Sequence, residues 1–167
     1  MRAEFDIQIT PEDLYRYNLR QTYVGLSGIT SFVIAGLLWV MAGVSAYSKE
    51  YPYMVAYLLA SIVILLYIPL TLRKKSAESL KKNEVLNKPL HYVVSEESVA
   101  VTQGEAHGEL PWDQVFHVVE TKYQILVFTT RIHAYIFPKD QLGEHYDTIR
   151  AIVSAQLPPY RAKLKKR

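Results

Sequence analysis

The chain of 167 residues contains no cysteine. This absence excludes disulfide bonds, thiolate metal sites and cysteine nucleophiles. Common catalytic signatures are also missing: the sequence has no Gly-x-Ser-x-Gly, no His-Glu-x-x-His and no glycine-rich phosphate loop ending in Lys-Ser or Lys-Thr. We therefore predict that the protein is not an enzyme and uses no cofactor. A membrane-bound hydrolase of unknown substrate stays an alternative, because the members of a catalytic triad need not be close in sequence.

Charged residues are absent from two long stretches near the start of the chain. No Asp, Glu, Lys or Arg occurs from 21 to 48 or from 51 to 72, and only Lys49 and Glu50 separate the stretches. About 20 apolar residues are enough to cross the hydrocarbon core of a bilayer. We therefore predict a hairpin of two transmembrane helices over residues 23–72. Its spans lack the acidic and basic side chains that line ion or proton pathways, so we interpret it as an anchor.

The basic residues that flank the hairpin predict its orientation. Arg16 and Arg20 precede it, and Arg73, Lys74 and Lys75 follow it, whereas the connecting loop holds a single lysine. Positively charged flanks stay on the cytoplasmic side of the membrane. We therefore expect a multi-pass plasma-membrane protein with both termini in the cytoplasm.

The segment 73–87 is predicted to be a basic juxtamembrane helix, because its composition favours a helix and Glu78 pairs with Lys82 at a spacing of four. Each basic side chain near an anionic membrane surface contributes about 1 kcal/mol of attraction. The same charges would also act as a topology signal alone. The proposed contacts with anionic lipid are Arg73, Lys74, Lys75, Lys81 and Lys82.

Small side chains recur at a spacing of four along both spans. Such faces allow two helix backbones to approach closely. We expect them to pack the two helices of the hairpin together, and packing between protomers is the alternative. The residues concerned are Ser27, Ser31, Ala35, Ala42 and Ala46 in the first span, and Ala56 and Ala60 in the second.

The segment 88–157 is predicted to be a small β domain that ends in a helix. Short stretches rich in β-branched and aromatic residues alternate with turns up to Phe137, and helical spacing returns from Glu144 to Leu157. This pattern predicts a small antiparallel barrel or sandwich capped by a C-terminal helix, in a chain that is α+β overall. Residues 158–167 form a basic tail, and we expect its last eight residues to be disordered.

A domain of this size is small for an independent core, and the N-terminal segment 1–22 offers additional strand and helix. Residues 5–9 alternate as in a strand, and Thr10 and Pro11 have the pattern of a helix N-terminus. We predict that the N-terminal strand pairs with the C-terminal sheet. The hairpin would then be an insertion into one cytoplasmic domain.

The chain resembles the YcxB-like family of bacterial membrane proteins. The resemblance is carried by Leu110-Pro-Trp-Asp-Gln-Val115, Val118-Val-Glu-Thr121 and Phe137-Pro-Lys139, together with the order of strand, two spans, basic linker and β domain. It implies an inner-membrane protein with a cytoplasmic domain like the pleckstrin-homology fold. It implies no known enzyme activity and no catalytic residues.

Two further sites were considered for ligands. Glu105, His107 and Glu109 would share one side of a strand, as in a zinc site, but they fall in an exposed hairpin, so we predict no metal. The first hairpin turn, Ser95–Ser98, is acidic, whereas phosphate-binding pleckstrin-homology domains carry basic residues there. This difference disfavours headgroup binding at that turn.

The sequence therefore predicts a non-enzymatic membrane protein whose cytoplasmic domain binds a protein partner or a second copy of itself. Membrane lipids are its other expected partners, and a domain that binds or handles anionic lipid is the main alternative. Nucleic acid is not expected, because the basic residues lie beside the membrane and in the tail rather than on an aromatic sheet face.

Overall fold

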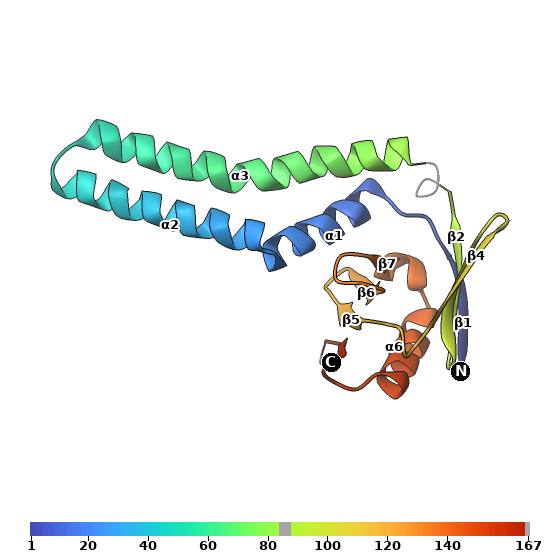
Figure 1. Ribbon diagram of the computed structural model, residues 1–167. Helices are drawn as coiled ribbons and strands as arrows, with labels where there is room; N and C mark the ends of the chain where they lie inside the picture. Colours follow the sequence, from blue (N-terminus) through green and yellow to red (C-terminus); the bar gives the residue numbers. More distant parts are fainter. Residues whose placement is uncertain (84–87, 166–167) are drawn as a thin grey trace. The chain divides into compact units, whose positions relative to one another are not determined.

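The structure, a computed structural model, describes residues 1–83 and 88–165, with the side chains of residues 26 and 27 left out (Figure 1). The chain divides into two compact units. The first, which we call the β unit, combines Met1–Asp13 with Leu80–Arg167, and the second, the helical unit, is Leu14–Ser79. Two long apolar helices and two mainly antiparallel sheets confirm the α+β class.

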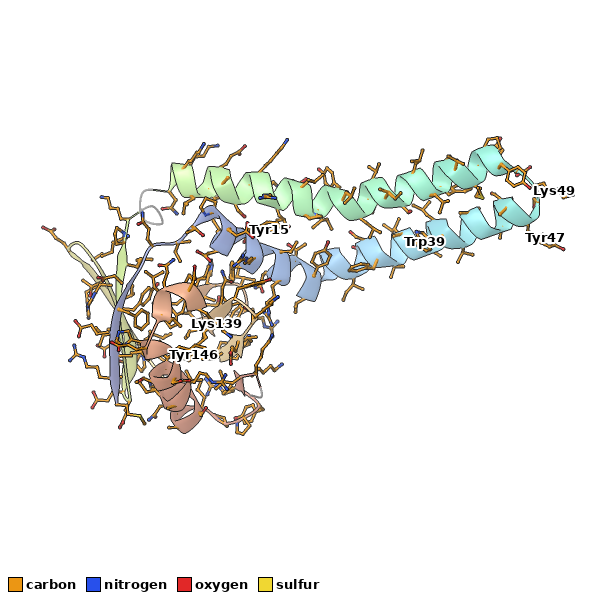
Figure 2. All side chains as sticks on the ribbon, turned by 180° about the vertical axis from the view of Figure 1, so that it is seen from behind. Tyr15, Trp39, Tyr47, Lys49, Lys139 and Tyr146 are labelled. Carbon is orange, nitrogen blue, oxygen red and sulfur yellow. The ribbon has the colours of Figure 1, made fainter. Side chains whose placement is uncertain are left out.

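The helical unit contains most of α1 (Pro11–Val24), all of α2 (Leu26–Tyr47) and most of α3 (Tyr51–Lys82). Helices α2 and α3 are long and apolar enough to cross a membrane. They run side by side in opposite directions, with Tyr47 and Lys49 at the turn between them (Figure 2). Helix α3 continues beyond its apolar stretch as far as Lys82, as predicted for the juxtamembrane segment. The predicted end of that segment, 84–87, lies outside the described residues.

One glycine, Gly25, separates α1 from α2, and a second, Gly28, lies in the first turn of α2. Gly25 precedes α2 in an extended conformation, so the helix starts at Leu26 rather than at the expected Tyr23. A Cβ on Gly28 would lie 2.6 Å from Cα of Tyr23 and 2.8 Å from the carbonyl oxygen of Thr22. Only glycine allows this close approach between the end of α1 and the start of α2.

The first sheet joins both ends of the chain's long helical insertion. Its order is β1 (Arg2–Ile7), β2 (Leu90–Ser95), β3 (Ser98–Gln103) and β4 (Ala106–Pro111), with every neighbouring pair antiparallel. The predicted pairing of the N-terminal strand with the C-terminal sheet is therefore confirmed, although the strand lies earlier than residues 5–9.

The second sheet has the order β7-β6-β5-β8. Strands β5 (His117–Glu120), β6 (Gln124–Phe128) and β7 (Ala134–Pro138) are antiparallel, and β8 (Ala162–Lys163) runs parallel to β5. The predicted lack of structure in the tail is wrong, because β8 lies within it. Residues 166 and 167 lie outside the described part.

Of the expected barrel or sandwich, the closed barrel does not form within the described residues. The chain turns after β4, where the N–H of Gln114 bonds the carbonyl of Pro111 at 3.0 Å and that of Val115 bonds Trp112 at 3.3 Å. These turn bonds replace the strand pairing that would have joined β4 to β5. The two sheets consequently remain separate.

Helices α5 (Lys139–Leu142) and α6 (His145–Gln156) follow the second sheet, and α6 contacts β1 and β2. Ile149, Ile152 and Val153 of α6 are fully buried, as its helical spacing predicts. An aromatic cluster links the sheets: the ring of Phe137 lies 5.4 Å from that of Phe5 and 4.9 Å from that of Tyr92. The core of the β unit therefore includes a residue from before the hairpin.

Candidate functional site

A cavity of about 410 Å³, open to solvent where the exposed Ala106 lines it, lies in the β unit between the inner face of the first sheet and strand β7. Leu90 and Val101 line one side, Ile136 lines the other, and Ile9 completes the wall. Its volume falls within the range of about 300–1,000 Å³ that is typical of ligand pockets. A mainly apolar wall of this kind suits an apolar group.

The cavity exists because β4 offers little side-chain volume at this end of the sheet. Ala106 lies opposite Gln103, and Gly108 lies opposite Val101, so two small residues occupy the inner face. A Cβ on Gly108 would already lie 3.3 Å from Cγ1 of Val101. The space between the sheets is therefore left unfilled by side chains at this end.

Two tyrosines contribute hydroxyl groups to the cavity wall. The rings of Tyr92 and Tyr135 lie 5.6 Å apart. Burial raises the pKa of the Tyr92 hydroxyl, and the neighbouring Tyr135 raises it further. Burial also raises the pKa of Tyr135. Both tyrosines therefore stay neutral at physiological pH and can donate hydrogen bonds.

The Tyr92 hydroxyl has no hydrogen-bond partner among the described residues. The residue is only 2% exposed. Every side-chain nitrogen or oxygen that is fully buried in this part of the chain does have a partner. The Tyr92 oxygen must therefore retain some contact with open space, and the cavity provides it.

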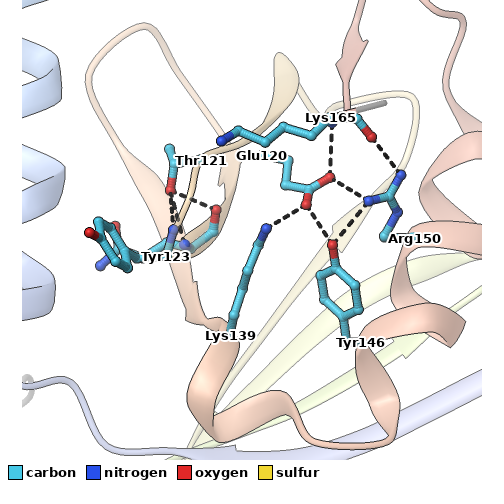
Figure 3. Close-up of polar contacts among 8 residues, drawn as sticks. Glu120, Thr121, Tyr123, Lys139, Tyr146, Arg150 and Lys165 are labelled. Atoms are coloured by element: carbon cyan, nitrogen blue, oxygen red, sulfur yellow. Dashed lines mark hydrogen bonds and ion pairs between the residues drawn. The ribbon is translucent and has the colours of Figure 1, made fainter. Parts of the chain in front are cut away.

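A second polar site is a buried carboxylate with four donors (Figure 3). Oε1 of Glu120 accepts hydrogen bonds from Nζ of Lys139 at 2.5 Å and from the hydroxyl of Tyr146 at 2.6 Å. Oε2 accepts from the Arg150 guanidinium at 2.9 Å and from the backbone N–H of Lys165 at 3.0 Å. Arg150 also donates to the Lys165 carbonyl at 2.8 Å. We call these five residues the Glu120 cluster.

The electrostatics of the Glu120 cluster indicate a structural role. Burial by itself raises the pKa of Glu120, but the hydrogen bonds from Lys139, Tyr146 and Lys165 outweigh it and hold the pKa below its ordinary value. The carboxylate is thus ionised at neutral pH and fully occupied by donors. It connects β5 with α5, α6 and the tail.

The outer face of the first sheet carries a half-buried histidine, His91, and an exposed one, His107. Nδ1 of His91 lies 2.7 Å from Asp6, and its Nε2 lies 3.2 Å from Glu4, so both nitrogens face carboxylates. The Oγ1 of Thr102, which lies opposite His91, is instead 3.0 Å from Nδ1 of His107.

The residues considered as a zinc site do not converge. Glu105 lies in the turn before β4 rather than on the strand, His107 contacts Thr102, and Glu109 accepts a hydrogen bond from Ser98 at 2.6 Å. In residues 1–83 and 88–165 we find no group of three or more His, Asp or Glu side chains that could hold a metal ion.

The basic residues proposed to contact lipid all lie on α3, and all are exposed. A separation of seven places Lys74 with Lys81, and Lys75 with Lys82, on common faces of the helix. Their positions are compatible with contact to a charged surface.

The small residues of the hairpin are distributed between a packed face and an exposed one. Ala35 and Ala42 are buried, Ser31 and Ala46 are half-buried, and the side chain of Ser27 is not described. Ala56 and Ala60, on α3, are exposed. The indole N–H of Trp39 donates to Oγ of Ser61 at 3.1 Å, a contact between α2 and α3 that the spacing of small residues did not predict.

Sequence reasoning missed both the cavity and the Glu120 cluster. The cluster joins residues that are up to 45 positions apart. A lone glutamate at the end of an apolar strand, followed by basic residues on a helix, was the only available signal. The cavity left no signal beyond Ala106 and Gly108 on β4.

Comparison with known proteins identifies part of the β unit. No curated protein and no solved structure matches the chain. Residues 94–153 match the family model described as YcxB-like protein. The matched range runs from β2 through most of α6 and includes Glu120, Tyr146 and Arg150. The resemblance to the YcxB-like family is thus confirmed for residues 94–153.

Proposed function

We propose that this protein is a non-enzymatic interaction module held at the cytoplasmic face of the inner membrane by a two-helix hairpin. The observation that carries the proposal is the pairing of β1 with β2, in which Phe5 lies opposite Tyr92. These strands precede and follow the hairpin, so they must lie on the same side of any membrane that the hairpin spans. An even number of spans satisfies this requirement.

The surface of the helical unit supports a lipid environment for α2 and α3. Only 17% of the most apolar window of α2 and 6% of that of α3 are buried. Large apolar side chains such as Val33, Leu37 and Leu59 are exposed. A helix in the core of a water-soluble protein would bury such side chains, whereas lipid chains accommodate them.

The direction of insertion rests on the basic residues at the ends of the hairpin. Arg73, Lys74 and Lys75 are exposed on α3 just beyond its apolar stretch. The turn between α2 and α3 holds a single lysine, Lys49, beside Glu50. This asymmetry favours a cytoplasmic β unit. In this position a fold like the pleckstrin-homology domain, with two sheets and a closing helix α6, would face cytoplasmic partners.

Binding rather than catalysis fits the site best. The cavity wall is mainly apolar, its polar side chains are the neutral tyrosines and Gln103, and the Glu120 carboxylate is occupied by four donors. An apolar cavity with a few hydrogen-bonding groups is typical of ligand and partner sites. We propose a protein partner, or a second copy of this chain, as what the β unit binds.

The proposal can be tested by chemical crosslinking of the full chain in its native membrane, followed by purification and mass spectrometry. We expect one defined partner, or a crosslinked dimer, that is retained by the wild type. The matched pair Ala106→Trp and Glu105→Trp places the same bulk inside the cavity and on the adjacent exposed turn. A monomer that retains no partner in the wild type would contradict the proposed function.

Binding to anionic lipid is the second candidate, favoured by the exposed Arg73, Lys74, Lys75, Lys81 and Lys82 on α3. Reconstituted full chain should then recruit added anionic vesicles, and recruitment should fall steeply as salt rises past about 0.15 M, where charges are screened within about 8 Å. Equal recruitment of neutral and anionic vesicles would remove the electrostatic basis of this candidate.

A further inference from the structure

Strand β7 is an edge of the second sheet, and its hydrogen-bonding pattern shows which backbone groups are free. The N–H of Thr129 bonds the carbonyl of His133 at 2.9 Å, and the N–H of Lys139 bonds that of Tyr123 at 2.8 Å. In an antiparallel ladder, bonded pairs alternate with pairs that do not bond each other. His133 and Lys139 both belong to bonded pairs. Every odd-numbered residue of β7, which lies between them, therefore also forms a bonded pair with β6.

The even-numbered residues Ala134 and Ile136 consequently turn their N–H and carbonyl groups away from β6. No other strand pairs with β7 among the described residues. Neither residue forms another hydrogen bond within the described part of the chain. An edge with unpaired backbone groups is a template for an added strand.

The free edge coincides with the cavity. Ala134, Tyr135 and Ile136 of β7 all line it, opposite Val101 and Gly108 of the first sheet. Side chains of a strand alternate between its two faces. A peptide added to β7 would therefore direct every second side chain toward the space between the sheets.

The polar groups of the cavity decide between a peptide and a hydrocarbon chain as its occupant. A hydrocarbon chain would fill the apolar space but would cover the free edge of β7 and the Tyr92 hydroxyl without giving them a hydrogen bond. Leaving a buried polar group unpaired costs about 1–3 kcal/mol. A peptide backbone supplies carbonyl and N–H groups that satisfy both. Apart from His107, whose side chain contacts Thr102 on the outer face of the sheet, the residues that line the cavity are uncharged, which favours an uncharged segment.

We propose that strand β7 and the adjoining cavity bind an extended, uncharged segment of a partner protein by strand addition, with one large apolar side chain of that segment in the cavity. This inference rests on the proposed function and names the class of partner. The backbone of the segment would pair with Ala134 and Ile136. Tyr92 would supply a further hydrogen bond from the cavity wall.

The test uses the full chain in detergent micelles and capped synthetic heptapeptides of the form Thr-Val-Thr-Xaa-Thr-Val-Thr, with a fluorescent label. Xaa is Leu, Ala or Asp, and a fourth peptide carries Leu together with N-methyl groups on alternate amides that block strand pairing. We expect the Leu peptide to bind, and the Ala, Asp and N-methylated peptides to bind at least about tenfold more weakly, a difference of 1.4 kcal/mol. Equal binding of the N-methylated peptide would overturn strand addition.

Two variants locate the site. Ala134→Pro removes one outward N–H while leaving the β6–β7 ladder intact, which proline tolerates on an edge strand. Ala106→Trp fills the cavity, and Glu105→Trp is its exposed control. We expect the first two to weaken binding of the Leu peptide at least about tenfold and the control to leave it unchanged. Unchanged binding to both Ala134→Pro and Ala106→Trp would place the peptide elsewhere and overturn the proposal.

Hydrogen exchange of the wild type provides a readout that does not depend on variant folding. Saturating Leu peptide should slow exchange of the Ala134 and Ile136 amides. A labelled fatty acid that binds while the peptide does not would replace strand addition with a lipid site. Strand addition would also be contradicted if the protein forms a dimer that the peptide does not dissociate while the amides of Ala134 and Ile136 remain unprotected from exchange.

The outcomes separate this inference from the proposed function. A crosslinked partner in native membranes without peptide binding would overturn strand addition and leave the interaction module standing. Peptide binding by a β unit that proves to lie outside the cytoplasm would support strand addition and overturn the cytoplasmic position in the proposed function.

Discussion

The backbone N–H of Lys165 donates a hydrogen bond of 3.0 Å to the buried carboxylate of Glu120. The side chain of Glu120 is only 1% exposed, and its carboxylate also accepts hydrogen bonds from Lys139, Tyr146 and Arg150 (Figure 3). The tail of the chain is thus attached to β5 by a charge as well as by the pairing of β8. The Glu120 cluster makes this basic tail part of the folded β unit.

Replacing Glu120 with glutamine should destabilise the β unit by about 3 kcal/mol, because Lys139 and Arg150 would lose the negative charge that pairs with them in a largely buried site. The loss can be measured by denaturant titration of the full chain in detergent, followed by tryptophan fluorescence. The control Glu109→Gln alters an exposed carboxylate on β4 and should change stability by less than about 0.5 kcal/mol. Equal effects of the two changes would show that the cluster contributes nothing.

The Glu120 cluster also predicts how stability depends on pH. The folded-state pKa of Glu120 lies below the ordinary value of 4.5. A carboxylate whose pKa is lowered on folding contributes stability above its unfolded pKa, and this contribution disappears as pH falls through the folded pKa. The wild type should therefore lose stability below about pH 4.5 more steeply than Glu120→Gln. Parallel pH profiles of the two proteins would contradict this account.

Truncating Phe5 to alanine should destabilise the distant β2–β8 region by about 3 kcal/mol, because its ring packs in the core against Phe137 and Tyr92. Limited proteolysis should then cut within residues 88–165 at lower denaturant. Glu4→Ala, on the exposed face of the same strand, is the matched control and should leave the cleavage pattern unchanged. A proteolysis pattern that is identical in Phe5→Ala and wild type would separate β1 from the fold.

Alanine at Gly28 should destabilise the helical unit by about 1–3 kcal/mol, because its Cβ would overlap the backbone of Thr22 and Tyr23. Thermal unfolding in detergent, followed by far-UV circular dichroism, measures the effect. Gly36→Ala is the control, since a Cβ there meets nothing within 4 Å. If both substitutions leave the melting curve in place, the close approach of α1 and α2 is not required.

Local chemistry made several features predictable from sequence. Thr10 and Asp13 form reciprocal hydrogen bonds at the start of α1: the N–H of Asp13 bonds Oγ1 of Thr10 at 3.2 Å, and that of Thr10 bonds Asp13 at 3.1 Å. Such a capping box depends on residues three apart, which a sequence displays directly. The alternation around Phe5 and the long charge-free stretches are equally local.

The pairing of β1 with the C-terminal sheet was predicted, but other features that depend on distant partners were not. The Glu120 cluster requires Arg150 and Lys165 to meet β5, and nothing in the spacing of these residues indicates that they do. The parallel pairing of Ala162 with Val118 is likewise set by how the tail returns past α6. The separation of the two sheets follows from the turn after Pro111, where local bonds took the place of the strand pairing that closes a barrel.

The absence of cysteine allows the central claim, a two-span hairpin inserted into one cytoplasmic unit, to be tested by labelling single introduced cysteines with a maleimide that cannot cross membranes. In intact bacterial spheroplasts, Ser48→Cys at the α2–α3 turn should react, whereas Glu96→Cys and Thr130→Cys in the β unit should react only after the membrane is permeabilised. Labelling of Glu96→Cys or Thr130→Cys in intact spheroplasts, or labelling of Ser48→Cys only after permeabilisation, would contradict the account.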